Sequence, residues 1–142
     1  MKFRARTLDE IADMICGNFD TATTKFVYRS SSYLTRFFQD ADTDYRHDGS
    51  TRAAWVSWAL AEIMNGPHEN AQTPPAAFAA VIRTLMDRAD AKNEGNDRPG
   101  ALAQLNATLS REGFEAFYAE DGVCYLRHMK TQQVASFVNP HR

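Results

Sequence analysis

The fold is decided by residues 105–118, LNATLSREGFEAFY, because the spacing of apolar residues changes within this stretch. Leu105 and Leu109 recur at the interval expected for one face of a helix. Gly113 suits the position just after a helix, where the backbone is often left-handed. In residues 114–118 the side chains then alternate, which is typical of a strand. The stretch therefore predicts a helix that leads directly into a β-strand.

A second strand is predicted shortly after the first. Asp121-Gly122 is a dipeptide that favours a tight turn between antiparallel strands. Val123, Tyr125 and Arg127 follow at alternate positions and predict the return strand. We therefore expect the chain to end in a β-hairpin.

Five helices are predicted before this hairpin. Each predicted helix begins at residues of a type that favours helix initiation. In chain order these are Thr7 with Glu10, Ser30 to Ser32, Ser50 or Thr51, Thr73-Pro74-Pro75, and Arg98-Pro99. Apolar residues at helical spacing follow each start, and Gly17 is expected to end the first helix. The predicted fold is mainly α, with about five helices and a C-terminal β-hairpin. Three helices followed by a hairpin is the element order of a winged helix, so a winged-helix-like arrangement is one expectation.

The composition is that of a soluble globular domain. The chain has 142 residues, 44% of them hydrophobic and 24% charged, with a formal charge of −2. We expect one domain over residues 1–136, with residues 137–142 forming a linker or the start of a following region. Cys16 and Cys124 each lie among apolar residues, so we expect buried thiols in a cytoplasmic protein. No stretch approaches the roughly 20 apolar residues that cross a bilayer, so no membrane contact is expected.

Two hydroxyl-rich segments with arginines are the best candidates for a binding site. Each lies where a helix is predicted to begin, and a helix start carries unpaired N–H groups and a partial positive charge. Such an end can hold a phosphate, while arginine and tyrosine together are also common at protein–protein hot spots. The candidate contacts to a partner protein or a phosphate are Arg29, Ser31, Ser32, Tyr33, Arg36, Ser50, Thr51 and Arg52. The alternative is that Arg29 and Arg52 pair locally with Asp40, Asp42, Asp44 or Asp48.

Catalytic, metal and cofactor sites are not expected. His47-Asp48 could pair a base with a carboxylate, but adjacent residues rarely face each other and no nucleophile is evident. The four histidines are scattered, and no Cys/His pair has the spacing of metal ligands. Trp55 and Trp58 are interpreted as core or half-buried interface residues.

A winged-helix DNA reader would place basic or amide side chains on the helix before the hairpin. Here that helix has Arg98 and Arg111 as its basic residues, both at its ends. The hairpin tip is Glu120-Asp121, which would repel phosphate. Nucleic-acid binding is therefore kept as an alternative, with Arg29, Arg36 and Arg52 as its contacts.

Residues 26–38, 47–52 and 105–114 resemble the N-terminal modules of bacterial abortive-infection proteins of the AbiJ type. The resemblance extends from the first helix to the hairpin. It implies a non-enzymatic sensor, adaptor or oligomerisation domain in an anti-phage effector, acting through a protein partner or self-association. A nuclease-like effector region would then lie beyond Arg142. A small phage-encoded inhibitor, complete at this length, is the weaker alternative.

Overall fold

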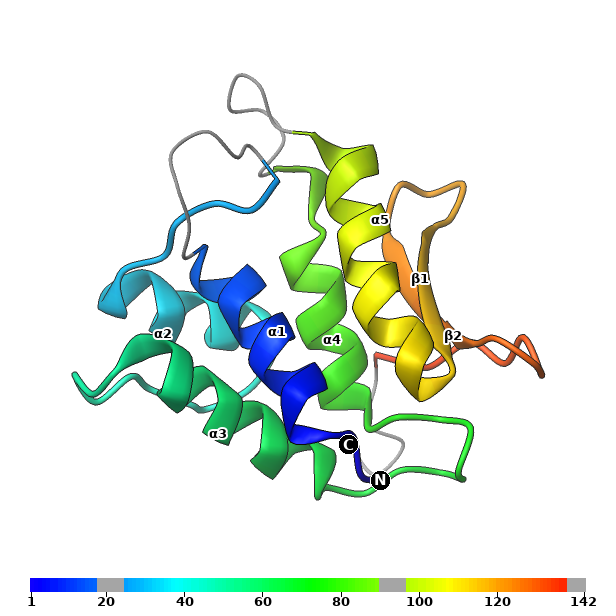
Figure 1. The fold of residues 1–142 in the computed structure, drawn as a ribbon, viewed down its shortest axis with the longest axis horizontal. Coiled ribbons are helices and arrows are strands. Elements are labelled where there is room, and N and C mark those ends of the chain that lie inside the picture. The colour runs from blue at the N-terminus through cyan, green and yellow to red at the C-terminus, as the bar shows by residue number, and fades with distance from the viewer. Residues whose placement is uncertain (18–24, 90–96, 138–142) are drawn as a thin grey trace.

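The computed structural model describes residues 1–17, 25–89 and 97–137. Five α-helices and one antiparallel hairpin make up the fold, which confirms the mainly α prediction (Figure 1). The elements are α1 (Ala5–Cys16), α2 (Ser31–Asp40), α3 (Arg52–Met64), α4 (Ala76–Leu85), α5 (Arg98–Leu109), the 3-10 turn η2 (Ser110–Glu112), β1 (Phe114–Tyr118) and β2 (Cys124–His128).

One core joins the helices to the hairpin. α1 packs on α3 and α5, while α4 packs on α2, α3 and β2. Phe3, which precedes α1, sets its ring 5.4 Å from that of Phe78 on α4 and 5.7 Å from that of Phe114 on β1. All three rings are buried. Truncating a buried phenylalanine typically costs about 3–5 kcal/mol, so Phe78 is a major contributor to stability.

The N-terminus of α1 differs from the predicted capping box. The helix begins at Ala5, so Thr7 lies within its first turn and is buried. Glu112, far along the chain, accepts hydrogen bonds from the Arg4 amide at 2.9 Å and from the Thr7 hydroxyl at 2.7 Å. Glu10 instead pairs with Arg111. The capping-box prediction is wrong because the carboxylate at this helix end belongs to Glu112, which tertiary packing brings there.

The hairpin pairs Phe114 with His128 at one end and Tyr118 with Cys124 at the other. Five residues connect the strands and include the predicted turn at Glu120-Asp121-Gly122, where Gly122 has φ 82°, and the return strand begins at Cys124, one residue after the predicted Val123. Asp121 helps to close this loop because its carboxylate accepts from the Val123 amide at 2.9 Å.

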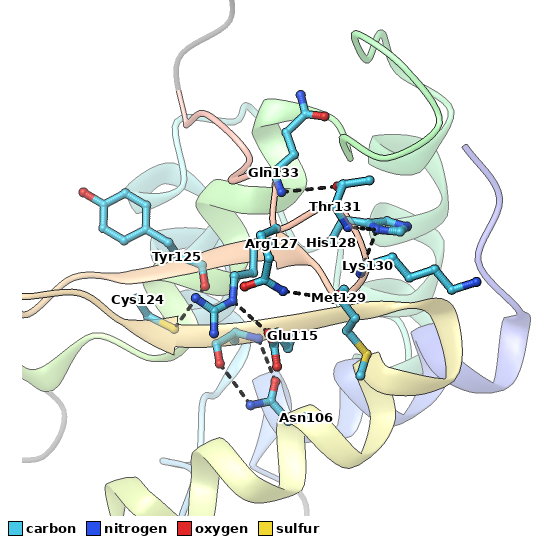
Figure 2. Close-up of polar contacts among 12 residues, drawn as sticks. Asn106, Glu115, Cys124, Tyr125, Arg127, His128, Met129, Lys130, Thr131 and Gln133 are labelled. Carbon is cyan, nitrogen blue, oxygen red and sulfur yellow. Dashed lines mark hydrogen bonds and ion pairs between the residues drawn. The ribbon is translucent and has the colours of Figure 1, made fainter.

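Asn106 joins α5 to the hairpin, as Figure 2 shows. Its amide nitrogen donates to the Ala116 carbonyl at 3.0 Å and its oxygen accepts from the Ala116 amide at 2.7 Å. Across the strands, Arg127 donates to Glu115 at 2.8 Å (Figure 2). The inward side chains of the hairpin are Phe114, Ala116, Cys124 and Leu126.

Candidate functional site

The two hydroxyl and arginine segments meet at the C-terminal end of α1. Arg29 donates from Nη1 to the Ile15 carbonyl at 3.0 Å, and Arg52 donates from Nη2 to the Cys16 carbonyl at 2.9 Å. The amide of Arg29 also donates to Cys16, at 3.1 Å. A helix end exposes unpaired carbonyls and carries a partial negative charge. Both guanidinium groups therefore stabilise the end of α1.

The two arginines are also held by aromatic rings. Arg29 is buried with its guanidinium carbon 4.7 Å from the centre of the Phe37 ring. Arg52 lies 4.4 Å above the Tyr28 ring and donates from Nε to the Arg29 carbonyl at 3.0 Å. Backbone carbonyls and aromatic rings therefore contact both arginines.

Gly17 makes this close approach between α1 and the next segment feasible. Its φ is 65°, in the left-handed region, which confirms its predicted role at the helix end. A Cβ at this position would lie 2.2 Å from the Val27 carbonyl oxygen. Glycine is therefore required both for backbone conformation and for space.

His47 joins the starts of α2 and α3. Its Nε2 lies 2.9 Å from the Ser50 carbonyl oxygen, which can only accept a hydrogen bond. Nε2 therefore donates to this carbonyl, and Nδ1 forms a hydrogen bond with the Ser31 hydroxyl at 2.5 Å. The ring also packs edge-on against Trp55, with centroids 5.1 Å apart. This bridging role was not predicted from the sequence, because it depends on residues 16 apart.

Asp48 is engaged within its own loop. Its carboxylate accepts from the Ser50 amide at 2.9 Å and from the Ser50 hydroxyl at 2.5 Å. These hydrogen bonds lower the pKa of Asp48 below its ordinary value. Ser50 is thus a partner of Asp48, and these hydrogen bonds place the carboxylate just before α3.

The other predicted site residues lie at the surface. Ser32, Tyr33, Arg36 and Thr51 are all exposed. The Arg36 guanidinium lies 5.6 Å from the centre of the Tyr33 ring. Thr51 occupies the position before α3, and its hydroxyl makes no capping hydrogen bond within the described ranges. Of the three arginines predicted as contacts, Arg36 is therefore the one at the exposed surface.

A groove lies beside α3 and was not predicted from the sequence. It consists of two cavities of about 440 and 540 Å³, and Tyr45 lines both. We call these two cavities the α3 groove. Trp58 lines the larger cavity with 52% of its surface exposed, and its ring lies 5.7 Å from that of Tyr45. Trp55 is buried behind it, so the interpretation as core holds for Trp55 and an interface position fits Trp58. The spacing of Trp55 and Trp58 in the sequence is the feature that could have indicated this groove.

Carboxylates predominate among the charged residues of the α3 groove. Asp42, Glu62 and Glu69 line the smaller cavity, and Asp44 and Asp48 line the larger one. Arg46 also lines the larger cavity. All six of these residues are exposed. The groove thus combines aromatic walls with an excess of negative charge.

The two cysteines are protected from solvent. Both are free and buried, as predicted. Burial raises the pKa of the Cys16 thiol to about 11 and that of the Cys124 thiol to about 12. Because the thiolate is the reactive form, neither cysteine has the character of a nucleophile. Among the described residues there is also no cluster of three His, Cys, Asp or Glu side chains that could hold a metal ion.

Several polar side chains of α5 and of η2 are engaged inside the protein. Arg98 is buried and donates from Nη2 to the Lys25 carbonyl, although its Nε and Nη1 have no partner in the described part of the chain. Asn106 binds Ala116, and Arg111 binds Glu10. A helix whose polar groups hold its own domain together has few left to read bases.

No protein-family model, no curated protein and no solved structure matches this chain. No helix in the described ranges is both long enough and apolar enough to cross a membrane. The candidate site must therefore be interpreted from its own geometry.

Proposed function

We propose that this chain is a non-catalytic protein-interaction domain. It would act as a sensor, adaptor or oligomerisation domain in a bacterial anti-phage effector, as the resemblance to AbiJ-type modules implies. The observation that carries the proposal is the exposure of aromatic side chains around α2 and α3.

Three of the five large hydrophobic side chains that are exposed among the described residues belong to this region. Tyr28, Tyr33 and Trp58 are 64%, 56% and 52% exposed. Tyrosine and tryptophan are enriched at the energetic centres of protein interfaces, because each buries a large area at a small cost in conformational entropy. A partner that covers these rings would remove a large aromatic surface from water.

The alternative of nucleic-acid binding is less well supported. It relied on Arg29, Arg36 and Arg52, but Arg29 is buried and Arg52 is engaged at the end of α1. Phosphate contacts need several exposed cations, because each neutralised phosphate adds to affinity. Arg36, which lies beside Tyr33, is a single exposed cation, and one cation is too few for phosphate binding.

Site-specific photocrosslinking tests the proposal. Benzoylphenylalanine would replace Tyr33 or Trp58 in the cells that carry the gene, and Glu120 at the hairpin tip would serve as the control position. We expect a discrete adduct from positions 33 and 58 and none from position 120. An adduct of twice the chain mass would indicate self-association. Plaque counts with and without the gene test the defensive role.

Two results would contradict this function. One is the absence of any discrete adduct from both positions. The other is hydrolytic activity of the full chain that disappears in a His47→Ala variant, because Ser31 and His47 form the hydroxyl–imidazole pair that a hydrolase would use.

A further inference from the structure

We infer that the α3 groove binds a basic, extended segment of the partner protein. The inference rests on the proposed function and adds the chemistry of the ligand. It is carried by the shape of the groove, its aromatic walls and its charge.

α3 forms one side of the groove, and residues of the segments 41–50, 66–77 and 136–137 form the rest of its lining. Ala54, Trp58 and Glu62 line it at intervals of four residues, which places them along one face of the helix, and Gly66 lies at its far end. A helix of 13 residues such as α3 is about 20 Å long. An extended chain covers that length with about six residues. The groove therefore fits a short extended segment better than it fits a compact ligand.

The aromatic walls suit a cation. Tyr45 and Trp58 stand nearly perpendicular, at 85°, and both line the larger cavity. Rings of this kind attract lysine or arginine through the negative charge of their faces, and tryptophan does so most strongly. Asp44 and Asp48 line the same cavity, and the Asp48 carboxylate accepts hydrogen bonds from the Ser50 amide and hydroxyl. A cationic side chain placed there would meet both a ring and a carboxylate.

The charge of the whole groove supports the same ligand. Five carboxylates line it, Asp42, Asp44, Asp48, Glu62 and Glu69, against the single arginine Arg46. Arg83, which lies over the Phe137 ring at the smaller cavity, adds a second cation, and the five carboxylates still outnumber the two arginines. An acidic surface attracts a basic partner and repels nucleic acid. The smaller cavity, with Ile63, Pro67 and Pro75 in its lining, can also take an apolar side chain between two cations.

Fluorescence anisotropy with a labelled peptide tests this inference on the full chain. The probe would be a six-residue peptide in which lysine or arginine alternates with leucine. Matched peptides would carry glutamate or glutamine at the cationic positions. We expect the basic peptide to bind at least about tenfold more tightly than the glutamine peptide, and its binding to weaken as salt rises. The glutamate peptide should not bind.

Groove variants decide whether the peptide uses this surface. Trp58→Ala should weaken binding about tenfold, as expected for a central interface residue, and Asp44→Asn with Glu62→Gln should weaken it severalfold. Glu120→Gln removes an exposed carboxylate at the hairpin tip and should leave binding unchanged. All four positions are exposed, so the variants should fold.

Several results would overturn the inference. Any one of three is sufficient. The basic and glutamine peptides could bind with equal affinity, or the basic peptide could bind the Trp58→Ala variant as well as it binds the parent. The third result is binding of a single-stranded oligonucleotide that Trp58→Ala abolishes. If the basic peptide fails but position 58 still crosslinks to a protein, the inference is wrong and the interaction function stands. If both fail, the proposed function is wrong as well.

Discussion

The guanidinium of Arg52 donates from Nη2 to the carbonyl oxygen of Cys16, 2.9 Å away, and thereby ties the start of α3 to the end of α1. The same side chain donates from Nε to the carbonyl of Arg29. One cation thus holds together the end of α1, the segment at Arg29 and the start of α3. This arrangement explains why arginines recur in the two segments without forming an open phosphate site.

Replacing Arg52 with glutamine should destabilise the protein by about 1–3 kcal/mol. The loss combines hydrogen bonds from a charged donor with the favourable interaction between a cation and a helix C-terminus. Urea unfolding followed by circular dichroism measures the change. Arg36→Gln is the matched control because Arg36 is exposed, and it should stay within about 0.5 kcal/mol of the parent. Equal effects of the two substitutions would contradict the capping role.

Two glycine substitutions separate backbone strain from lack of space. Gly17 and Gly49 both have left-handed φ angles, 65° and 88°. Gly49→Ala should cost about 1–2 kcal/mol from backbone conformation, because nothing in the described chain lies within 4 Å of the added Cβ. Gly17→Ala should cost clearly more, because its Cβ would lie 2.2 Å from the Val27 carbonyl oxygen. Thermal or urea unfolding of both variants compares them, and similar costs would show that the close approach at Gly17 is not maintained.

The bridge between His47 and Ser31 predicts a measurable coupling. Ser31→Ala and His47→Ala should each lower stability, and the double variant should lose about 0.5–1.5 kcal/mol less than the sum of the two. A double-mutant cycle from urea unfolding at pH 7.5 gives this value. Strict additivity would mean that the 2.5 Å contact between Ser31 Oγ and His47 Nδ1 does not contribute in solution.

The buried thiols predict low reactivity and a loss of stability at high pH. Burial raises the pKa of Cys16 from 9.0 to about 11 and that of Cys124 from 9.0 to about 12. The folded state therefore favours the protonated thiols. Their contribution to the free energy of unfolding is complete below pH 9 and is lost as the pH rises through 11 and 12. At pH 8, labelling by a disulfide reagent should be slow in buffer and fast in urea.

A variant with both cysteines replaced by alanine isolates this effect from the tyrosines. Burial also raises the pKa of Tyr45 and Tyr118, so the parent protein loses stability at high pH for more than one reason. Between pH 8 and 10.5 the double variant should lose less stability than the parent. Equal losses, or rapid labelling at pH 8 without urea, would contradict the burial of the thiols.

The local features of the fold follow from the sequence. The starts of α2 and α5, the stop at Gly17 and the strand after Gly113 were all predicted correctly, because helix ends and changes of apolar period depend on neighbouring residues. The capping of α1 by Glu112 was not predicted, because the residues that it joins, Arg4 and Thr7, are more than 100 positions away.

The sequence by itself determined the helical class, the hairpin, the burial of the cysteines and the two helix starts that are rich in hydroxyls and arginines. Only the tertiary structure decided what those segments do. It directs Arg29 and Arg52 to the carbonyls of α1, and it places Tyr45 and Trp58 beside five carboxylates in the α3 groove. The physical reason is that periodicity and capping are set by interactions within a few residues. The partner of a charged or aromatic side chain is set by which distant elements pack against it.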